Sequence, residues 1–159
     1  MTCKAFLPIN GFKFQVHKLP GFEEYVQGVT FPGVVMGETG GFKTPFQTIA
    51  LPGEHMTFEP ISARFKVNYD MSNYTEIFDW IRGLAKPTSY AERKALLDPQ
   101  IQATLSILDS SLNPTIQYTF YDLYPDYLSG FTLALDANDI QYVEATVRFN
   151  YTNYDYNTL

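Results

Sequence analysis

Between Ile61 and Leu84 a strand pattern runs directly into a helix pattern, which leaves few folds open to the chain. Apolar and polar side chains first alternate, as in a half-buried strand, with the apolar set Ile61, Ala63, Phe65, Val67 and Tyr69. Asn73 then stands three residues before Glu76, a capping-box spacing that predicts a helix with Asn73 as its cap. Apolar residues follow at helical spacing, namely Tyr74, Ile77, Phe78, Ile81 and Leu84. The sequence therefore predicts one amphipathic helix, residues 73–83, packed against a sheet.

Most of the remaining sequence alternates between strands and turns. Alternating patterns predict further strands at 12–16, 25–31, 101–107, 116–121 and 142–152. Gly28 inside the second of these indicates a bulge or a close backbone approach, and the turn residues at 109–114 predict a hairpin. Residues 89–98 are either a short second helix or an irregular connector, and 123–127 form an aromatic bend before a short run at 131–135. The fold class is therefore mainly β.

The stretch 32–60 differs from the rest because glycine and proline interrupt it repeatedly and leave only short apolar pieces. Two of these pieces, 46–51 and 55–58, flank Pro52-Gly53, a dipeptide suited to a tight reversal. Loops above about 12–15 residues are uncommon in compact domains unless they have a function. The stretch is interpreted either as an extended arm that becomes ordered against another chain or as a mobile surface loop.

Length, charge and cysteine content exclude several classes of protein. A chain of 159 residues with 45% hydrophobic residues has the size of one domain, and we expect a single domain over 1–159. The net charge of -6, with only 11 Lys and Arg, argues against a surface that neutralises phosphates. Cys3 is the single cysteine, which excludes an internal disulfide. The first ten residues lack a signal-like apolar run, so we expect synthesis in the cytoplasm.

Residue types that carry catalysis are few in this sequence. It contains two histidines, His17 and His55, which are interpreted as structural, and none of the common nucleophile, zinc or phosphate-loop motifs. Three neighbouring carboxylates fit no calcium loop and are assigned to a solvated turn; they are Asp136, Asp139 and Glu144. We predict no catalytic, cofactor-binding or metal-binding residues and no enzymatic activity. Trp80, beside the apolar stripe of the helix, is interpreted as core margin or as an interface anchor.

Several short motifs stand in a set order along the chain: Leu19-Pro20-Gly21, Phe31-Pro32-Gly33, Thr44-Pro45-Phe46, Leu51-Pro52-Gly53, the helix with Trp80-Ile81, and the closing strand Val143 to Tyr151. Together they resemble the tail tube proteins of contractile-tailed bacteriophages. The resemblance covers about Phe12 to Tyr156. Members of that family fold as two antiparallel sheets packed into a barrel-like sandwich, with one flanking helix and an extended arm. They assemble as hexameric rings stacked into a hollow tube.

The resemblance implies a role for each part of this chain. The arm, 32–60, with Thr44, Pro45, Phe46, Pro52 and Gly53, would reach a neighbouring subunit or ring. The outer face of the helix would face a neighbour or a surrounding sheath, through Glu76, Asp79 and Arg82. Implied partners are further copies of the chain, the tail sheath protein and the baseplate and terminator tube proteins. DNA would pass through the lumen without specific binding, and the protein would be part of the virion tail, assembled in the host cytoplasm.

Two alternatives remain open from the sequence. The same fold serves baseplate initiators, tube terminators and the tubes of secretion systems, so the repeating tube subunit and a terminal ring protein are both consistent with the resemblance. The rival from another class is a monomeric ligand-binding or carbohydrate-binding β-sandwich, with a stacking platform made by Tyr121, Tyr124 and Tyr127. A binding module is a monomer whose melting shifts with ligand, whereas a tube subunit forms rings or polymerises.

Overall fold

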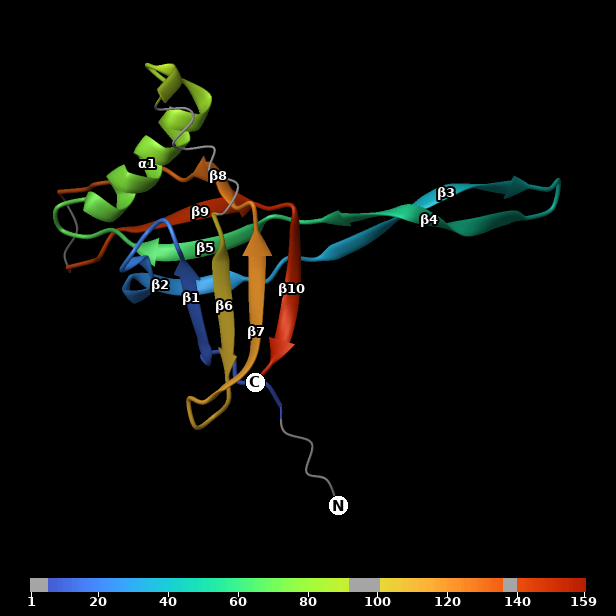
Figure 1. Cartoon of the computed structure of the whole chain (residues 1–159), viewed down its shortest axis with the longest axis horizontal. Coiled ribbons are helices and arrows are strands. Elements are labelled where there is room, and N and C mark those ends of the chain that lie inside the picture. Colours follow the sequence, from blue (N-terminus) through green and yellow to red (C-terminus); the bar gives the residue numbers. More distant parts are fainter. Residues whose placement is uncertain (1–5, 92–100, 136–139) are drawn as a thin grey trace.

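Two four-stranded antiparallel sheets cross steeply and form a sandwich, with one helix beside them and a long two-stranded ribbon projecting from them (Figure 1). The computed structural model describes residues 6–91, 101–135 and 140–159. Sheet 1 has the order β1-β6-β7-β10, with bounds Phe12–Val16, Ala103–Leu108, Pro114–Tyr121 and Asn153–Thr158. Sheet 2 has the order β2-β5-β9-β8, with bounds Val26–Thr30, Ile61–Lys66, Glu144–Asn150 and Tyr124–Leu128. The predicted mainly β sandwich with one flanking helix is confirmed.

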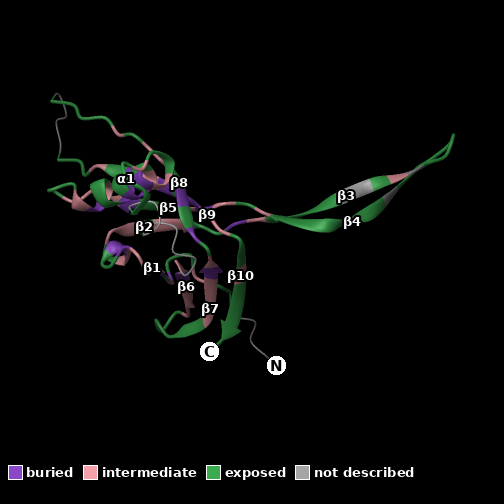
Figure 2. Ribbon diagram, turned by 45° about the horizontal axis from the view of Figure 1, so that its top comes forward, coloured by how far each residue is buried: buried purple, intermediate pink, exposed green. Residues whose placement is uncertain are grey.

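The core lies between the two sheets, because the alternation of each strand turns its apolar side chains inward. Four phenylalanines are fully buried, one or more from each sheet: Phe14, Phe65, Phe120 and Phe149. The rings of Phe14 and Phe149 meet across the sandwich at a centroid distance of 6.3 Å. In Figure 2 the buried positions gather in the sandwich, whereas the ribbon is almost entirely exposed.

The helix, α1 (Ser72–Ala85), begins before the predicted cap. Met71 is the N-cap residue, in a left-handed conformation and without a side-chain cap, so the prediction of Asn73 as the cap is wrong. The side chain of Asn73 is buried instead and holds the end of β5: its Oδ1 accepts from Asn68 N–H at 3.1 Å and its Nδ2 donates to the Lys66 carbonyl at 2.8 Å. The Asn73 amide thus forms hydrogen bonds with the backbone groups that follow β5. Backbone groups inside the fold need a protein partner, whereas those of the exposed helix terminus can bond to water.

The buried face of α1 is centred on Ile77 and Trp80. The Trp80 ring lies 6.1 Å from that of Phe149, so Trp80 belongs to the core and is not an interface anchor. Phe78, predicted on the apolar face, is half exposed because the stripe follows positions 73, 77, 80 and 83 and turns Phe78 away. No helix of the described residues is long and apolar enough to span a membrane.

Several predicted strand boundaries are wrong. β5 ends at Lys66, and Tyr69 lies in the following turn with 96% of its surface exposed. The predicted aromatic bend contains β8, while 131–135 form no strand. The predicted last strand, 142–152, is β9, which leaves sheet 2 at Asn150 and continues as β10 in sheet 1. The apolar alternation shifts by one position at that change of sheet, from an odd-numbered set that ends at Tyr151 to the even-numbered Tyr154 and Tyr156. Cys3, Asp136, Asp139 and residues 92–98 of the segment 89–98 lie outside the described residues.

The predicted hairpin and bulge are confirmed. β6 and β7 pair antiparallel around the turn, where the Asp109 carboxylate accepts from the N–H groups of Ser111 and Asn113 at 2.8 and 2.9 Å. The register of β2 against β5 shifts at Gly28, where an extra residue is accommodated.

Candidate assembly surfaces

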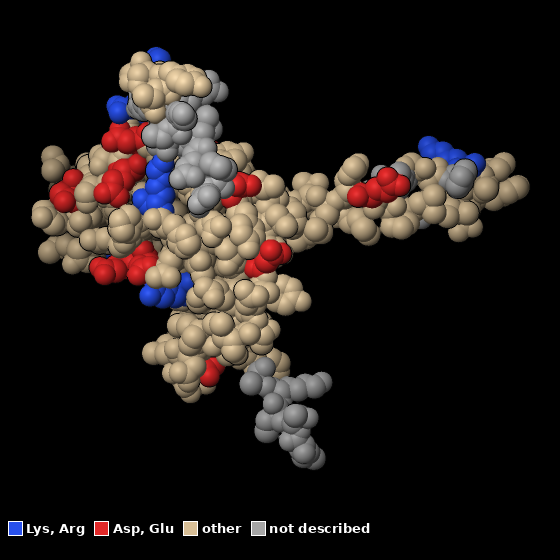
Figure 3. Space-filling model, in the orientation of Figure 1, with Lys and Arg blue, Asp and Glu red and all other residues tan. Residues whose placement is uncertain are grey.

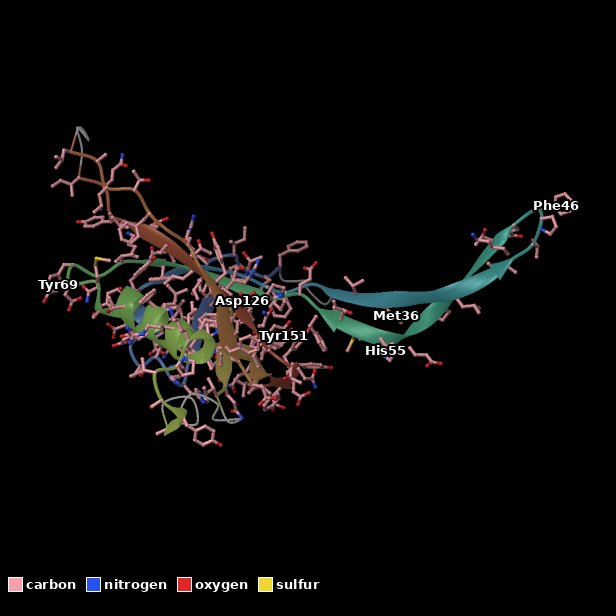
Figure 4. The ribbon with its side chains drawn as sticks, turned by 90° about the horizontal axis from the view of Figure 1, so that it is seen from above. Met36, Phe46, His55, Tyr69, Asp126 and Tyr151 are labelled. Atoms are coloured by element: carbon pink, nitrogen blue, oxygen red, sulfur yellow. The ribbon has the colours of Figure 1, made fainter. Side chains whose placement is uncertain are left out.

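The ribbon consists of β3 (Val34–Lys43) and β4 (Thr48–Phe58), paired antiparallel with each other. Figure 4 shows Met36 and His55 midway along the ribbon and Phe46 at its far end. Apolar side chains are exposed on both strands: Val34, Val35, Met36, Ile49, Leu51 and Met56. The segment 32–60 is thus an extended arm, in line with one of the two interpretations. Its two strands are ordered by pairing with each other within the one chain.

The tip of the ribbon is a turn over residues 44–47. Thr44 Oγ1 donates to the Gln47 carbonyl at 2.8 Å and accepts from Gln47 N–H at 3.0 Å, which closes the turn. Pro45 is in the second position of the turn, where its fixed φ suits the reversal. Phe46 follows with 98% of its surface exposed. The turn therefore presents an unshielded aromatic ring at the point farthest from the sandwich (Figure 4).

Pro52 and Gly53 do not make the predicted reversal, because both lie inside β4. Pro52 faces Glu38 at a place where the register shifts, and a Cβ on Gly53 would collide with the backbone of Gly37. In a two-stranded ribbon each strand has one free edge, so the N–H that proline lacks is not needed there. The register shift leaves residues 53–55 opposite Gly37, so Gly53 begins a bulge that follows Pro52, and the actual reversal lies at Thr44.

Aromatic rings fix the base of the ribbon to sheet 1. Phe31, just before β3, contacts Tyr118 at 4.9 Å, and Phe58, the last residue of β4, contacts Tyr154 at 5.4 Å. The Tyr151 hydroxyl donates to the Glu59 carbonyl at 2.8 Å. Burial, assisted by Tyr154 and Glu59, raises the pKa of Tyr151 to about 12. These contacts set the direction in which the ribbon leaves the sandwich.

Gly33 leaves room for the Glu59 side chain at the base of the ribbon. Gly33 N–H donates to the Glu59 carboxylate at 3.2 Å, and Glu59 N–H donates back to the Gly33 carbonyl at 3.0 Å. A Cβ at Gly33 would lie 2.6 Å from that carboxylate. A larger residue would therefore push the Glu59 carboxylate away from the Gly33 N–H.

The outer edges of the two sheets differ. In sheet 2 both outer strands are irregular: β2 has the bulge at Gly28, and β8 contains Pro125 and a register shift between Pro125 and Tyr127. Such features block the addition of a further strand. In sheet 1, β1 and β10 keep an unbroken register with their neighbours and contain no proline. Within the described residues β1 pairs only with β6 and β10 only with β7, so sheet 1 has two regular free edges.

The outward face of sheet 1 is almost free of charge. Lys13 and Asp155 are the only charged residues in its four strands, whereas the strands of sheet 2 contain Arg64, Lys66, Asp126, Glu144 and Arg148. Side chains that can form hydrogen bonds lie opposite one another across the face: Gln15, Thr104, Thr119, Ser106, Gln117 and Asn157. Figure 3 shows the surface over β6 and β7 without Lys, Arg, Asp or Glu.

Solved structures of contractile injection systems share this architecture over the whole chain. A chain of the anti-feeding prophage cap, the AFP tube terminating cap, has a TM-score of 0.69 at 9% identity and covers 100% of this chain and 95% of its own. A chain of the sheath/tube terminator of PVC, an extracellular contractile injection system, has a TM-score of 0.68 at 14% identity, covering 98% and 99%. A chain of the PVC sheath-tube complex has 0.65 at 14%, covering 99% and 95%.

This chain has the tail tube fold. The resemblance predicted from the sequence is confirmed at the level of the fold. No protein-family model matches the sequence, and the search of curated proteins finds no match.

Within the tail tube fold, α1 presents its polar face to solvent. Glu76, Asp79 and Arg82 are all exposed, and Arg82 pairs with Asp79 at 3.2 Å one turn away. The face opposite Ile77 therefore carries two carboxylates and one guanidinium that are available to a partner.

The residues examined for ligand chemistry do not converge. Tyr127 lies under the Arg148 guanidinium at 5.4 Å, and among the described residues its ring contacts neither Tyr121 nor Tyr124, so no stacking platform forms. His17 follows β1 and His55 lies in the exposed ribbon. The described residues contain no group of three or more His, Cys, Asp or Glu that could hold a metal ion.

Sequence reasoning missed two features of the tail tube fold in this chain: β10 with its free edge, and the aromatic contacts at the base of the ribbon. The signal for β10 was present in Tyr154 and Tyr156, which alternate with polar residues. The pairing of Phe31 with Tyr118 joins segments far apart in sequence and left no local pattern.

Proposed function

We propose that this protein is a structural subunit of the inner tube of a contractile tail, assembled as stacked hexameric rings around a bore through which DNA passes without specific binding. The observation that carries the proposal is the match of the whole chain, ribbon included, to tube-terminator and sheath-tube structures. Its partners are then further copies of itself, the tail sheath and the baseplate and terminator proteins. Its place is the virion tail, assembled in the host cytoplasm.

The ribbon supports this proposal because it is poorly suited to a monomer. Isolated two-stranded ribbons are marginally stable in water, and this one exposes apolar side chains along both strands. Contact with a neighbouring subunit or ring would bury them. We assign the inter-subunit arm to the ribbon, with its tip at Thr44, Pro45 and Phe46 and its register shift at Pro52 and Gly53.

The helix supplies the second surface of the proposal. Glu76, Asp79 and Arg82 form a polar, exposed face that suits a wet contact with the sheath or with an adjacent subunit. Substitution of these three residues by alanine should leave rings intact and weaken binding of sheath protein in a co-sedimentation assay.

A terminal ring is the second candidate function. It is favoured by two of the similar structures, the AFP tube terminating cap and the PVC sheath/tube terminator, with TM-scores of 0.69 and 0.68. A terminator ring caps a tube and does not stack on itself. The two candidates therefore differ in the length of the assembly: a long tube for the repeating subunit and a single ring for the terminator.

The deciding experiment is negative-stain electron microscopy of the purified protein over a concentration series. Long hollow tubes support the repeating subunit, and single six-fold rings that bind the end of a preformed tube support the terminator. A monodisperse monomer at every concentration, even with tube ends added as seeds, would contradict both. A ligand-dependent shift in melting temperature would then favour a binding module.

A further inference from the structure

Two of the four methionines of this chain stand opposite each other in the ribbon. Met36 on β3 pairs in register with Met56 on β4, and residues directly opposite in an antiparallel pair project their side chains to the same face. The Cβ atoms of such a pair are about 4.5–5.5 Å apart. The two thioethers therefore form one patch, midway along the ribbon where Figure 4 shows Met36.

The face that carries this methionine pair is continuous with the core of the sandwich. Val34 pairs with Phe58 two residues closer to the sandwich, so both lie on the same face as the pair. The Phe58 ring contacts Tyr151 and Tyr154 at 5.9 and 5.4 Å. Both of these rings contact the fully buried Phe120. The apolar face of the core thus runs outward along the ribbon.

Exposure increases along this face with distance from the sandwich. Phe58 is half-buried, Val34 is 45% exposed, and Met36 and Met56 are 60% and 59% exposed. Thioethers are soft, polarisable groups that pack well at contact surfaces. In the assembly proposed above, the ribbon lies against another copy and the pair is buried. The same two sulfurs are therefore accessible in the free subunit and covered in the assembled one.

We propose that Met36 and Met56 are an oxidation site that controls assembly: a peroxide converts their thioethers to sulfoxides on the free subunit, and the oxidised ribbon no longer docks on its neighbour. The inference rests on the role of the ribbon as the inter-subunit arm proposed above. It assigns to that arm a covalent modification and a class of oxidant.

The oxidation is a two-electron transfer of one oxygen atom at each sulfur. The thioether sulfur attacks one peroxide oxygen, so that an S–O bond forms as the O–O bond breaks. The hydroxide that is released takes the proton from the transferred oxygen and leaves as water. The sulfur is oxidised by two electrons and the peroxide is reduced by the same two, so hydrogen peroxide is the only co-reactant required.

The sulfoxides change the patch from apolar to polar. Each sulfoxide oxygen accepts hydrogen bonds from water in the free subunit, and docking would remove that water. A buried acceptor without a donor opposes association. Both side chains face solvent in the single copy, so the fold has no need of their apolar character. The effect is therefore expected on assembly and not on folding.

Treatment with hydrogen peroxide tests the inference, in a Cys3→Ala background because peroxide also oxidises thiols. Peptide mass spectrometry follows sulfoxide at Met36, Met56 and Met71; Met71, at the N-cap of α1 and 37% exposed, is the internal reference. Sulfoxide should form at Met36 and Met56 before Met71, and severalfold more slowly in assembled protein than in free subunits. Oxidised subunits should need a severalfold higher concentration to assemble under the electron microscope, with an unchanged Tm.

Three variants separate the methionine pair from other effects of peroxide. Met36→Leu with Met56→Leu keeps the apolar volume without the sulfur, so it should assemble normally and become insensitive to peroxide. Met71→Leu is the matched control and should remain sensitive. Met36→Gln with Met56→Gln places polar groups at the same positions and should assemble poorly without any oxidant.

The outcomes distinguish the oxidation site from the tube function. Oxidised wild-type protein that assembles as well as untreated protein, or a double leucine variant that loses assembly in peroxide to the same extent, would overturn the oxidation site and leave the tube function standing. Equal rates of oxidation at the pair in free and assembled protein would do the same. Untreated protein that fails to assemble even on tube ends would contradict the tube function, and the inference with it.

Discussion

The sandwich and the ribbon use the same kind of antiparallel pairing with opposite results. In the sandwich, pairing brings apolar side chains of two sheets face to face, and Phe65, Phe120 and Phe149 are fully buried. In the ribbon, β3 and β4 satisfy each other's backbone groups, yet Met36, Met56 and their neighbours remain exposed because no second layer covers them. Both regions contain paired backbone hydrogen bonds, but only the sandwich buries its apolar side chains.

The comparison separates what holds the fold from what is offered to a partner. Net stability from a backbone hydrogen bond is small, about 1 kcal/mol, whereas burial of apolar surface is the dominant favourable term. We therefore expect the sandwich to fold without the outer ribbon and the ribbon to matter for association. Only the base of the ribbon, where Phe31 and Phe58 touch sheet 1, belongs to both regions.

The largest expected effect comes from shortening the ribbon. Glu38 and Pro52 are paired in register, so residues 39–51 can be replaced by Asn-Gly, a two-residue hairpin turn. Assembly into rings or tubes should be abolished, while the free energy of unfolding changes by only about 0.5 kcal/mol. Electron microscopy and urea denaturation measure the two effects. Tubes formed by the shortened protein would show that the ribbon is a plain loop.

A large effect on stability is expected at the helix. Ile77→Ala removes a fully buried side chain and should lower the free energy of unfolding by about 2–5 kcal/mol in urea denaturation. Phe78→Ala, next to it and half exposed, is the matched control and should cost no more than about 1 kcal/mol. Equal losses at the two positions would mean that α1 is rotated from its position against the sheets.

A smaller effect is expected where ribbon and sandwich meet. Tyr151→Phe removes the hydroxyl that donates to the Glu59 carbonyl and should cost about 1 kcal/mol, measured by urea denaturation. Tyr154→Phe is the control, because its hydroxyl makes no hydrogen bond among the described residues. If tube formation falls in Tyr151→Phe more than stability does, the base of the ribbon sets its direction.

The smallest effect is a pH dependence. The folded state raises the pKa of Tyr151 from 10.0 to about 12, so folding favours the protonated phenol. That contribution is fully present below pH 10 and is lost as the pH rises through about 12. Stability should therefore fall more steeply between these values in the wild type than in Tyr151→Phe. Parallel pH profiles of the two proteins by thermal melting would contradict this assignment.

The sandwich was predictable because its signals are local. Strand alternation at Phe12 to Val16 and the helix stripe around Ile77 depend on residues a few positions apart. Predictions failed where a tertiary contact overrode a local preference. Asn73 is a residue type favoured at helix N-caps, but its side-chain amide forms hydrogen bonds with the backbone of Lys66 and Asn68 instead.

The ribbon was harder to derive, since its glycines and prolines resemble those of a loop. Pro52-Gly53 reads as a turn, and only the pairing of Pro52 with Glu38 shows that the strand continues through it. The free edges of sheet 1 were invisible as well, because they depend on the order in which distant strands meet. Position within a sheet is a property of topology, which a single sequence does not encode locally.

Sheet 1 begins and ends on strands of opposite direction, and this has a consequence for counting. A copy added at either edge would expose an identical edge of its own, so pairing of edges alone would permit a chain of any length. In the hexameric ring proposed above, each copy would be turned by about 60° from its neighbour. A substitution that altered only the angle between neighbouring copies would then turn closed rings into open spirals.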